Sequence, residues 1–172
     1  MARMVWTATG VAWALRSLLE FLAPQYFNPT TPLDHVAIWA YTAALLLTAP
    51  AAVELARLAA LRSVTAVAIA TAAGAIVAGV ANVAEDVLRV AGSGYAYVAG
   101  FLVMVCGLLV NSVILAIFRR WRLAAAFALW CLGIFLFTIA GGGLLIFAVM
   151  VTVALRPTWF KEIGRGRQPT VP

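Results

Sequence analysis

Long runs of apolar residues recur along this chain, and they constrain its fold more than any other feature. Each run covers about 20 residues, the length that an α-helix needs to cross the hydrocarbon core of a bilayer. Hydrophobic residues make up 65% of the chain and charged residues 10%, whereas a soluble domain has about 25% charged residues. The runs lack the period-two alternation of a membrane β-barrel. The sequence therefore predicts an all-α, polytopic transmembrane helix bundle in one domain, residues 1–160.

We predict six membrane segments. The first four run from about Met4 to Leu22, Pro32 to Leu61, Val64 to Ala91 and Tyr95 to Phe118. The third is rich in small residues that let neighbouring helices approach closely, so we expect it to be central. The uncharged stretch Leu123–Leu155 is long for one span and short for two. It forms either two short legs that turn at Gly141–Gly143 or one long helix, which would leave five segments.

The distribution of basic residues predicts the orientation. The net charge is +6 and the pI is about 10.2, and cytoplasmic loops of membrane proteins carry an excess of Lys and Arg. With six segments and both termini in the cytoplasm, all Lys and Arg except Arg16 and Arg89 fall on the cytoplasmic side. Residues 161–172 then form a short basic cytoplasmic tail. This pattern accounts for the positive charge without a nucleic-acid partner. The composition is typical of bacterial membrane proteins, so we expect the cell membrane.

Polar residues gather at the predicted outer side of the bundle. Within the third segment they recur at spacings of three and four, which places them on one side of a helix. They can line a site for a cation, a proton or a polar headgroup. Alternatively they form the ion pairs Arg16–Glu20 and Glu85–Arg89 with a helix cap at Asp34. This outer polar cluster comprises Arg16, Glu20, Asp34, His35, Asn82, Glu85, Asp86 and Arg89.

Other polar positions have simpler interpretations. Glu54 and Arg57, three residues apart, predict an ion pair at the inner membrane edge. Deep in the fourth segment, a polar pair is expected to bond a neighbouring helix or to line a pore. A basic cluster that follows orients the protein and contacts anionic lipid headgroups. These two sets are Asn111 with Ser112, and Arg119, Arg120 and Arg122. The chain has one histidine and no Cys/His spacing typical of metal ligands, so we expect no bound metal and no cofactor.

Three functions are compatible with the sequence. No catalytic motif is present and the segments outside the membrane are short, so we expect a non-enzymatic subunit of a membrane assembly, with a membrane-protein partner or a second copy of the chain. The first alternative is a small transporter or channel-like protein, with a cavity reaching from the outer polar cluster toward Asn111. The second is a membrane-embedded enzyme that acts on lipid through Glu85 or Asp86.

Overall fold

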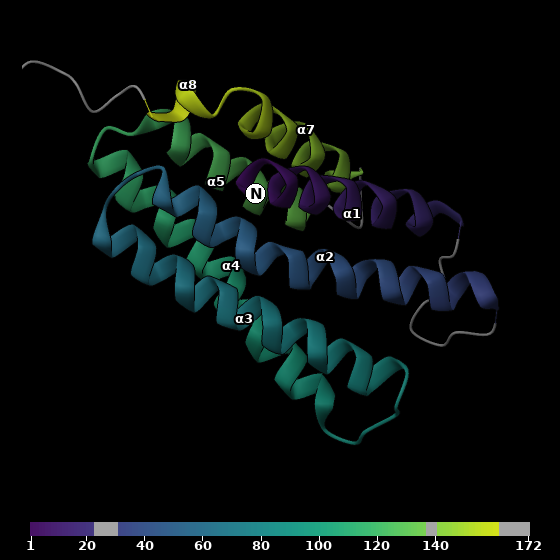
Figure 1. Ribbon diagram of the computed structural model, residues 1–172. Helices are drawn as coiled ribbons and strands as arrows, with labels where there is room; N and C mark the ends of the chain where they lie inside the picture. The colour runs from purple at the N-terminus through teal and green to yellow at the C-terminus, as the bar shows by residue number, and fades with distance from the viewer. Residues whose placement is uncertain (23–30, 137–140, 162–172) are drawn as a thin grey trace, which may run out of the picture.

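The computed structural model describes residues 1–22, 31–136 and 141–161, and over these residues the chain is helical without strands. The predicted tail therefore lies outside the described residues, apart from Lys161. Three helices, α2, α3 and α4, are long and apolar enough to cross a membrane, and two shorter apolar helices follow. The helices are α1 (Ala2–Leu22), α2 (Pro32–Arg57), α3 (Arg62–Asp86), α4 (Ser93–Ile117), α5 (Trp121–Phe135), α7 (Gly142–Leu155) and α8 (Pro157–Lys161) (Figure 1). The predicted all-helical membrane class is confirmed at this level.

The helices pack in the order of the chain. Each of α1 to α4 contacts the next helix, and α5 contacts α7. Helix α7 in turn contacts α1, so these six described helices close into a ring. In Figure 1, α2 runs between α1 and α3. Bulky side chains fill the interior, because alanine-rich helices alone would leave voids. The largest fully buried ones include Trp6 and Trp13 of α1 and Phe127 and Trp130 of α5.

The third helix has two neighbours, as the other helices of the ring do, and the others do not surround it. Helix α3 packs on α2 and α4, and 44% of its most apolar stretch is buried, against 61% for α2. Its small residues serve one close contact instead. A Cβ added at Gly74 would lie 2.7 Å from the Gly100 carbonyl oxygen of α4, and one at Gly100 would lie 2.6 Å from the Ala78 nitrogen. Small residues therefore indicated the closeness of one helix pair and not the number of neighbours.

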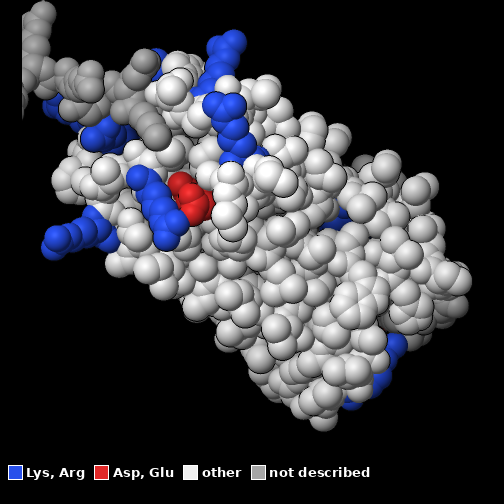
Figure 2. All heavy atoms as spheres, viewed as in Figure 1, with Lys and Arg blue, Asp and Glu red and all other residues white. Residues whose placement is uncertain are grey.

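One end of the molecule collects the basic residues. The start of α1, the end of α2 and the start of α8 line one surface hollow there, and Arg122 of α5 hydrogen-bonds to α8. Figure 2 shows Lys and Arg concentrated on this side, with few on the rest of the visible face. We call it the basic end. It carries every described Lys and Arg except Arg16 and Arg89, namely Arg3, Arg57, Arg62, Arg119, Arg120, Arg122, Arg156 and Lys161.

Tight turns make successive helices antiparallel. The turns after α2, α3 and α4 each contain a residue other than glycine with positive φ: Ala60 (53°), Arg89 (55°) and Arg119 (56°). The N–H of Arg120 donates to the Leu115 carbonyl at 2.8 Å. This six-residue closure of a helix end is the Schellman arrangement, in which a left-handed residue reverses the chain.

The uncharged stretch 123–155 forms two separate helices. Helix α5 ends at Phe135, and α7 begins after Gly141, whose φ is +69°. A Cβ at Gly133 would lie 2.8 Å from the Gly142 carbonyl oxygen. At the far end Arg122, near the start of α5, bonds to Trp159 after α7. Contacts at both ends make the pair antiparallel, so the single long helix is wrong and the two-leg alternative holds for the described residues.

Candidate functional site

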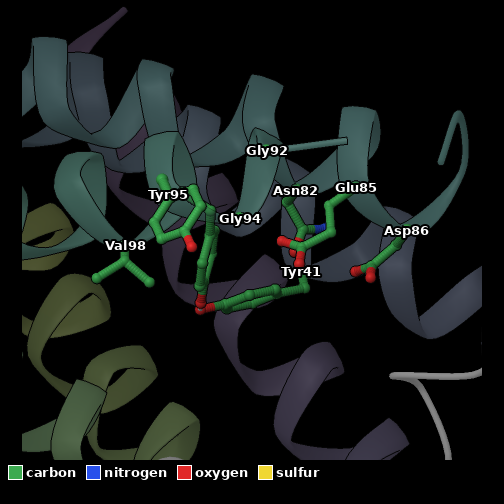
Figure 3. Close-up of a pocket in the computed structure, with 9 residues that line it drawn as sticks. Tyr41, Asn82, Glu85, Asp86, Gly92, Gly94, Tyr95 and Val98 are labelled. Atoms are coloured by element: carbon green, nitrogen blue, oxygen red, sulfur yellow. The ribbon is translucent and has the colours of Figure 1, made fainter. Parts of the chain in front are cut away.

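A pocket of about 560 Å³ opens between α2, α3 and α4 at the end of the molecule opposite the basic end. We call it the acidic pocket, because its charged lining residues are both carboxylates. Figure 3 shows Glu85 and Asp86 projecting from the end of α3, with the Tyr41 ring across the pocket. The lining residues are Tyr41, Asn82, Glu85, Asp86, Gly92, Gly94, Tyr95, Tyr97 and Val98.

The α3–α4 turn makes room for the carboxylates. Gly92 precedes α4 with a φ of +83°, which favours glycine because it lacks a Cβ. Gly94 lies in the first turn of α4, and a Cβ there would sit 2.6 Å from a Glu85 carboxylate oxygen. Both glycines line the pocket. The absence of a side chain at Gly94 therefore leaves room for the Glu85 carboxylate, whereas Gly92 serves the backbone conformation of the turn.

Hydrogen bonds close the base of the pocket. The Tyr41 and Tyr97 hydroxyl oxygens are 2.6 Å apart and share a hydrogen bond between α2 and α4. The Asn82 amide donates to the Thr42 hydroxyl over 3.0 Å and ties α3 to α2. Asn111 does not line the pocket. The described pocket therefore does not extend to Asn111, and the predicted cavity toward that residue stays a prediction.

A buried positive charge lies behind this base. Arg16 of α1 is fully buried and forms an ion pair with Glu20, as predicted. Its guanidinium carbon lies 5.5 Å from the centroid of the Tyr41 ring, and the Trp13 ring packs edge-on against the same tyrosine. A fixed arginine charge opposes the passage of cations. An ion pair, and not a further pair of carboxylates, therefore lies just beyond Tyr41.

The rest of the outer polar cluster is dispersed. Asp34 forms a capping box with Thr31 at the start of α2, as the alternative interpretation predicted. His35 is exposed, one position further along α2. The predicted Glu85–Arg89 ion pair does not form. Helix α3 ends at Asp86, so Arg89 lies in the turn and the four-residue helical spacing does not apply. Within the described ranges the ion pairs are Arg16–Glu20 and the predicted Glu54–Arg57.

The remaining predicted positions lie elsewhere. Asn111 is fully buried in α4, and its amide has no hydrogen-bond partner in the described part of the chain. Ser112 donates to the Ala124 carbonyl at 2.9 Å and links α4 to α5. Arg119 is exposed and Arg120 half-buried at the turn before α5. Among the described residues, no three metal-ligating side chains of the His, Cys, Asp and Glu types lie together.

Sequence reasoning missed the aromatic part of the pocket. The sequence pointed to the carboxylates and the amide of the pocket but not to Tyr41, Tyr95 or Tyr97. The nearness of Tyr97 to the carboxylates is visible in the sequence, since both flank the same short turn. No pattern pairs Tyr41 with Tyr97, which is 56 residues away, because that contact depends on how α2 packs beside α4.

Comparison of the chain with known protein families, with curated proteins and with solved structures finds no match in any of the three. The chemistry of the pocket itself is informative. Its described lining offers two carboxylates, three phenols and one amide, but no serine, cysteine or histidine. Such groups accept hydrogen bonds, and the two carboxylates attract positive charge.

Proposed function

We propose that this protein is a non-enzymatic, multi-pass protein of the cell membrane that binds a small organic cation in the acidic pocket. The observation that carries the proposal is the composition of that pocket. Glu85 and Asp86 share it with three tyrosines, and neither carboxylate has an ion-pair partner among the described residues. Two adjacent carboxylates beside aromatic rings, neither of them in a salt bridge among the described residues, form an environment that favours a cation.

Charge supports a topology of six crossings with both termini in the cytoplasm. Lys and Arg are retained on the cytoplasmic side of membrane proteins, and the basic end contains all the described ones except Arg16 and Arg89. The start of α1 and the start of α8 both lie at that end. An even number of crossings follows if the chain leaves the cytoplasm in α5 and returns in the antiparallel α7. The acidic pocket then faces outward.

The pocket suits an organic ammonium group better than a metal ion. A divalent metal needs several oxygen ligands converging within about 2–2.6 Å, whereas the described residues hold no group of three suitable side chains. The pocket volume of about 560 Å³ lies in the range of small-molecule sites. Tyrosine faces attract ammonium groups, and carboxylates supply the opposite charge. We therefore propose an amine or quaternary ammonium compound as the ligand.

The arrangement favours binding over conduction. The Tyr41–Tyr97 hydrogen bond closes the base, and buried Arg16 lies behind it. A cation moving deeper would leave two carboxylates for the Arg16–Glu20 pair, whose carboxylate is already bound to the arginine, so it would lose favourable charge interactions. We therefore propose that this site binds a cation and is not part of a continuous pore.

The test uses choline and its uncharged carbon isostere, 3,3-dimethylbutanol, as matched probes in calorimetric titrations of the purified protein in nanodiscs. We expect choline to bind at least about tenfold more tightly than the isostere, because only choline interacts with the carboxylates and the ring faces as a cation. We expect Glu85→Gln and Asp86→Asn to remove this preference.

Glu54→Gln is the matched control, because Glu54 is an acid at the opposite end with its own partner, Arg57. It should leave choline binding unchanged. Equal binding of the two probes would contradict cation recognition. A loss of binding in Glu54→Gln as large as in Glu85→Gln would mean that general charge, and not the pocket, attracts the probe.

A second candidate function is that of a subunit in a membrane assembly. The observation that favours it is the exposed apolar surface beside the pocket. Tyr95 is 86% exposed, Leu88 67% and Val90 52%, and all three lie at or near the α3–α4 turn. A partner that covers this surface would bury them. Native mass spectrometry of protein gently extracted from its own membranes tests this function. A second polypeptide at a fixed ratio supports it, and the chain alone contradicts it.

A further inference from the structure

A second hollow lies at the basic end, between the antiparallel helices α5 and α7. It has a volume of about 360 Å³. Alanines form much of its wall, with Ala125 and Ala126 on α5 and Ala148 on α7, and Leu129 and Leu145 line it further from the basic end. Leu129 lies seven positions after Arg122 in α5, so the hollow extends about 10 Å along the helix. It is an apolar groove with the length of a short segment of hydrocarbon chain.

A preorganised arginine marks the other end of this groove. Arg122 donates a hydrogen bond to the Trp159 carbonyl oxygen at 2.9 Å, and its guanidinium carbon lies 4.4 Å from the centroid of the Trp159 ring. Trp159 packs edge-on against Phe160. These contacts hold the guanidinium at the groove. A guanidinium has five N–H donors in a planar fork that matches phosphate oxygens, so donors remain for a ligand.

We propose that this groove binds one anionic phospholipid, with its phosphate at Arg122 and part of one acyl chain along the alanines between α5 and α7. Charge complementarity carries the choice of occupant. No acidic residue is among the described residues that line the groove, and the same end of the molecule carries Arg119, Arg120 and Arg156. Basic pockets between membrane helices on the cytoplasmic side bind anionic headgroups.

The shape of the groove distinguishes a lipid from a free anion. A phosphate ion would use the arginine alone and leave the alanine-walled hollow without an occupant. An acyl chain fits that hollow, because alanine side chains leave space between the helices that neighbouring leucines do not fill. The site is also independent of the acidic pocket, which lies at the opposite end of α3 and α4, so the two proposals can fail separately.

The experiment is native mass spectrometry of the full chain, delipidated in detergent and then titrated with phosphatidylglycerol or with phosphatidylcholine of the same acyl composition. We expect one phosphatidylglycerol to be retained in preference to phosphatidylcholine. Arg122→Gln should weaken this retention about fivefold, the effect of one basic residue near a headgroup. Ala148→Phe should weaken it as well, because Ala148 is exposed in the groove, and a phenyl group there fills the groove without entering the core.

Two matched variants control for general effects. Arg62→Gln removes an exposed arginine of the basic end that does not line the groove, and Ala73→Phe adds a phenyl group to an exposed face of α3. Both should retain phosphatidylglycerol as the unaltered chain does. Equal retention of the two lipids would overturn the proposal. So would a loss in Arg62→Gln equal to that in Arg122→Gln, or unchanged retention in Ala148→Phe. Competition by inorganic phosphate alone would reassign the site to a free anion.

Discussion

The two ends of the helical ring handle charge in opposite ways. The basic end exposes most of its arginines, and its ion pair, Glu54–Arg57, lies at the surface. The other end buries Arg16 completely, pairs it with Glu20 behind the Tyr41 ring, and leaves Glu85 and Asp86 to line a pocket. Exposed charges orient a membrane protein at little energetic cost, whereas buried ones are costly and tend to mark a site. The exposed charges of the basic end therefore serve to orient the protein, whereas the charges of the other end mark the candidate binding site.

The largest effect should come from the buried ion pair. Arg16→Met keeps most of the side-chain volume but leaves Glu20 without its partner, and we expect a loss of about 3–5 kcal/mol of unfolding free energy. Arg57→Met, which breaks the exposed pair, should cost less than about 1 kcal/mol. Reversible unfolding by sodium dodecyl sulfate in mixed micelles measures both. Equal costs would remove the contrast between the two ends.

The double variant Arg16→Met with Glu20→Met separates charge from packing. Replacing both members of a buried pair by apolar residues is often neutral or stabilising, so we expect the double variant to recover most of the stability that Arg16→Met loses. A double variant as unstable as Arg16→Met would show that the pair is held for packing and not for charge.

The next effect concerns the contact that holds two walls of the acidic pocket together. Gly100→Ala places a methyl group against the α3 backbone, since a Cβ there lies 2.6 Å from the Ala78 nitrogen. Separating α3 from α4 should cost about 1–3 kcal/mol in the same unfolding assay. The control is Ala99→Leu, which adds more volume on an exposed face of α4 and should cost less than about 0.5 kcal/mol. A larger cost for the control would place the close contact elsewhere.

A smaller effect is expected at the base of the pocket. Tyr97→Phe removes the hydrogen bond to Tyr41 while keeping the ring, and should cost about 0.5–1.5 kcal/mol. Choline binding should persist, because the ring and both carboxylates remain. Tyr95→Phe alters an exposed tyrosine at the mouth of the pocket and serves as the control with no expected loss of stability. Loss of choline binding in Tyr97→Phe alone would mean that the hydroxyl itself contacts the ligand.

Local rules predicted the parts of the acidic end that depend on neighbours along one helix. The Arg16–Glu20 pair follows from a four-residue spacing, and the Thr31–Asp34 capping box follows from the residues before α2. The same spacing rule failed for Glu85 and Arg89, because α3 ends between them. A spacing rule is valid only while the helix continues, and no strong stop signal precedes Gly92.

Tertiary packing determined what the sequence did not predict. The Tyr41–Tyr97 contact joins residues 56 positions apart and brings two tyrosines from different helices into the acidic pocket. The place of α3 as one member of a ring has the same origin, since small residues report how close two helices lie but not how many surround them. Membrane class and the gathering of basic residues at one end depend on composition and segment order, so they were predictable without packing.

The smallest effect concerns the turns that join the helices at each end. Arg119 and Arg89 adopt left-handed backbone conformations, with φ of 56° and 55°, which cost a residue with a side chain about 1–2 kcal/mol. Arg119→Gly should relieve this cost, and the greater flexibility of glycine in the unfolded chain offsets part of it, so we expect a gain of up to about 1 kcal/mol. Arg119→Gln removes the same charge but keeps the strain, and should give no gain. Arg89→Gly should behave like Arg119→Gly, because Arg89 has the same left-handed backbone conformation and no salt bridge among the described residues. A loss of stability in Arg89→Gly alone would show that Arg89 interacts with the carboxylates of the acidic pocket, and the contrast between the two ends would then extend to their turns.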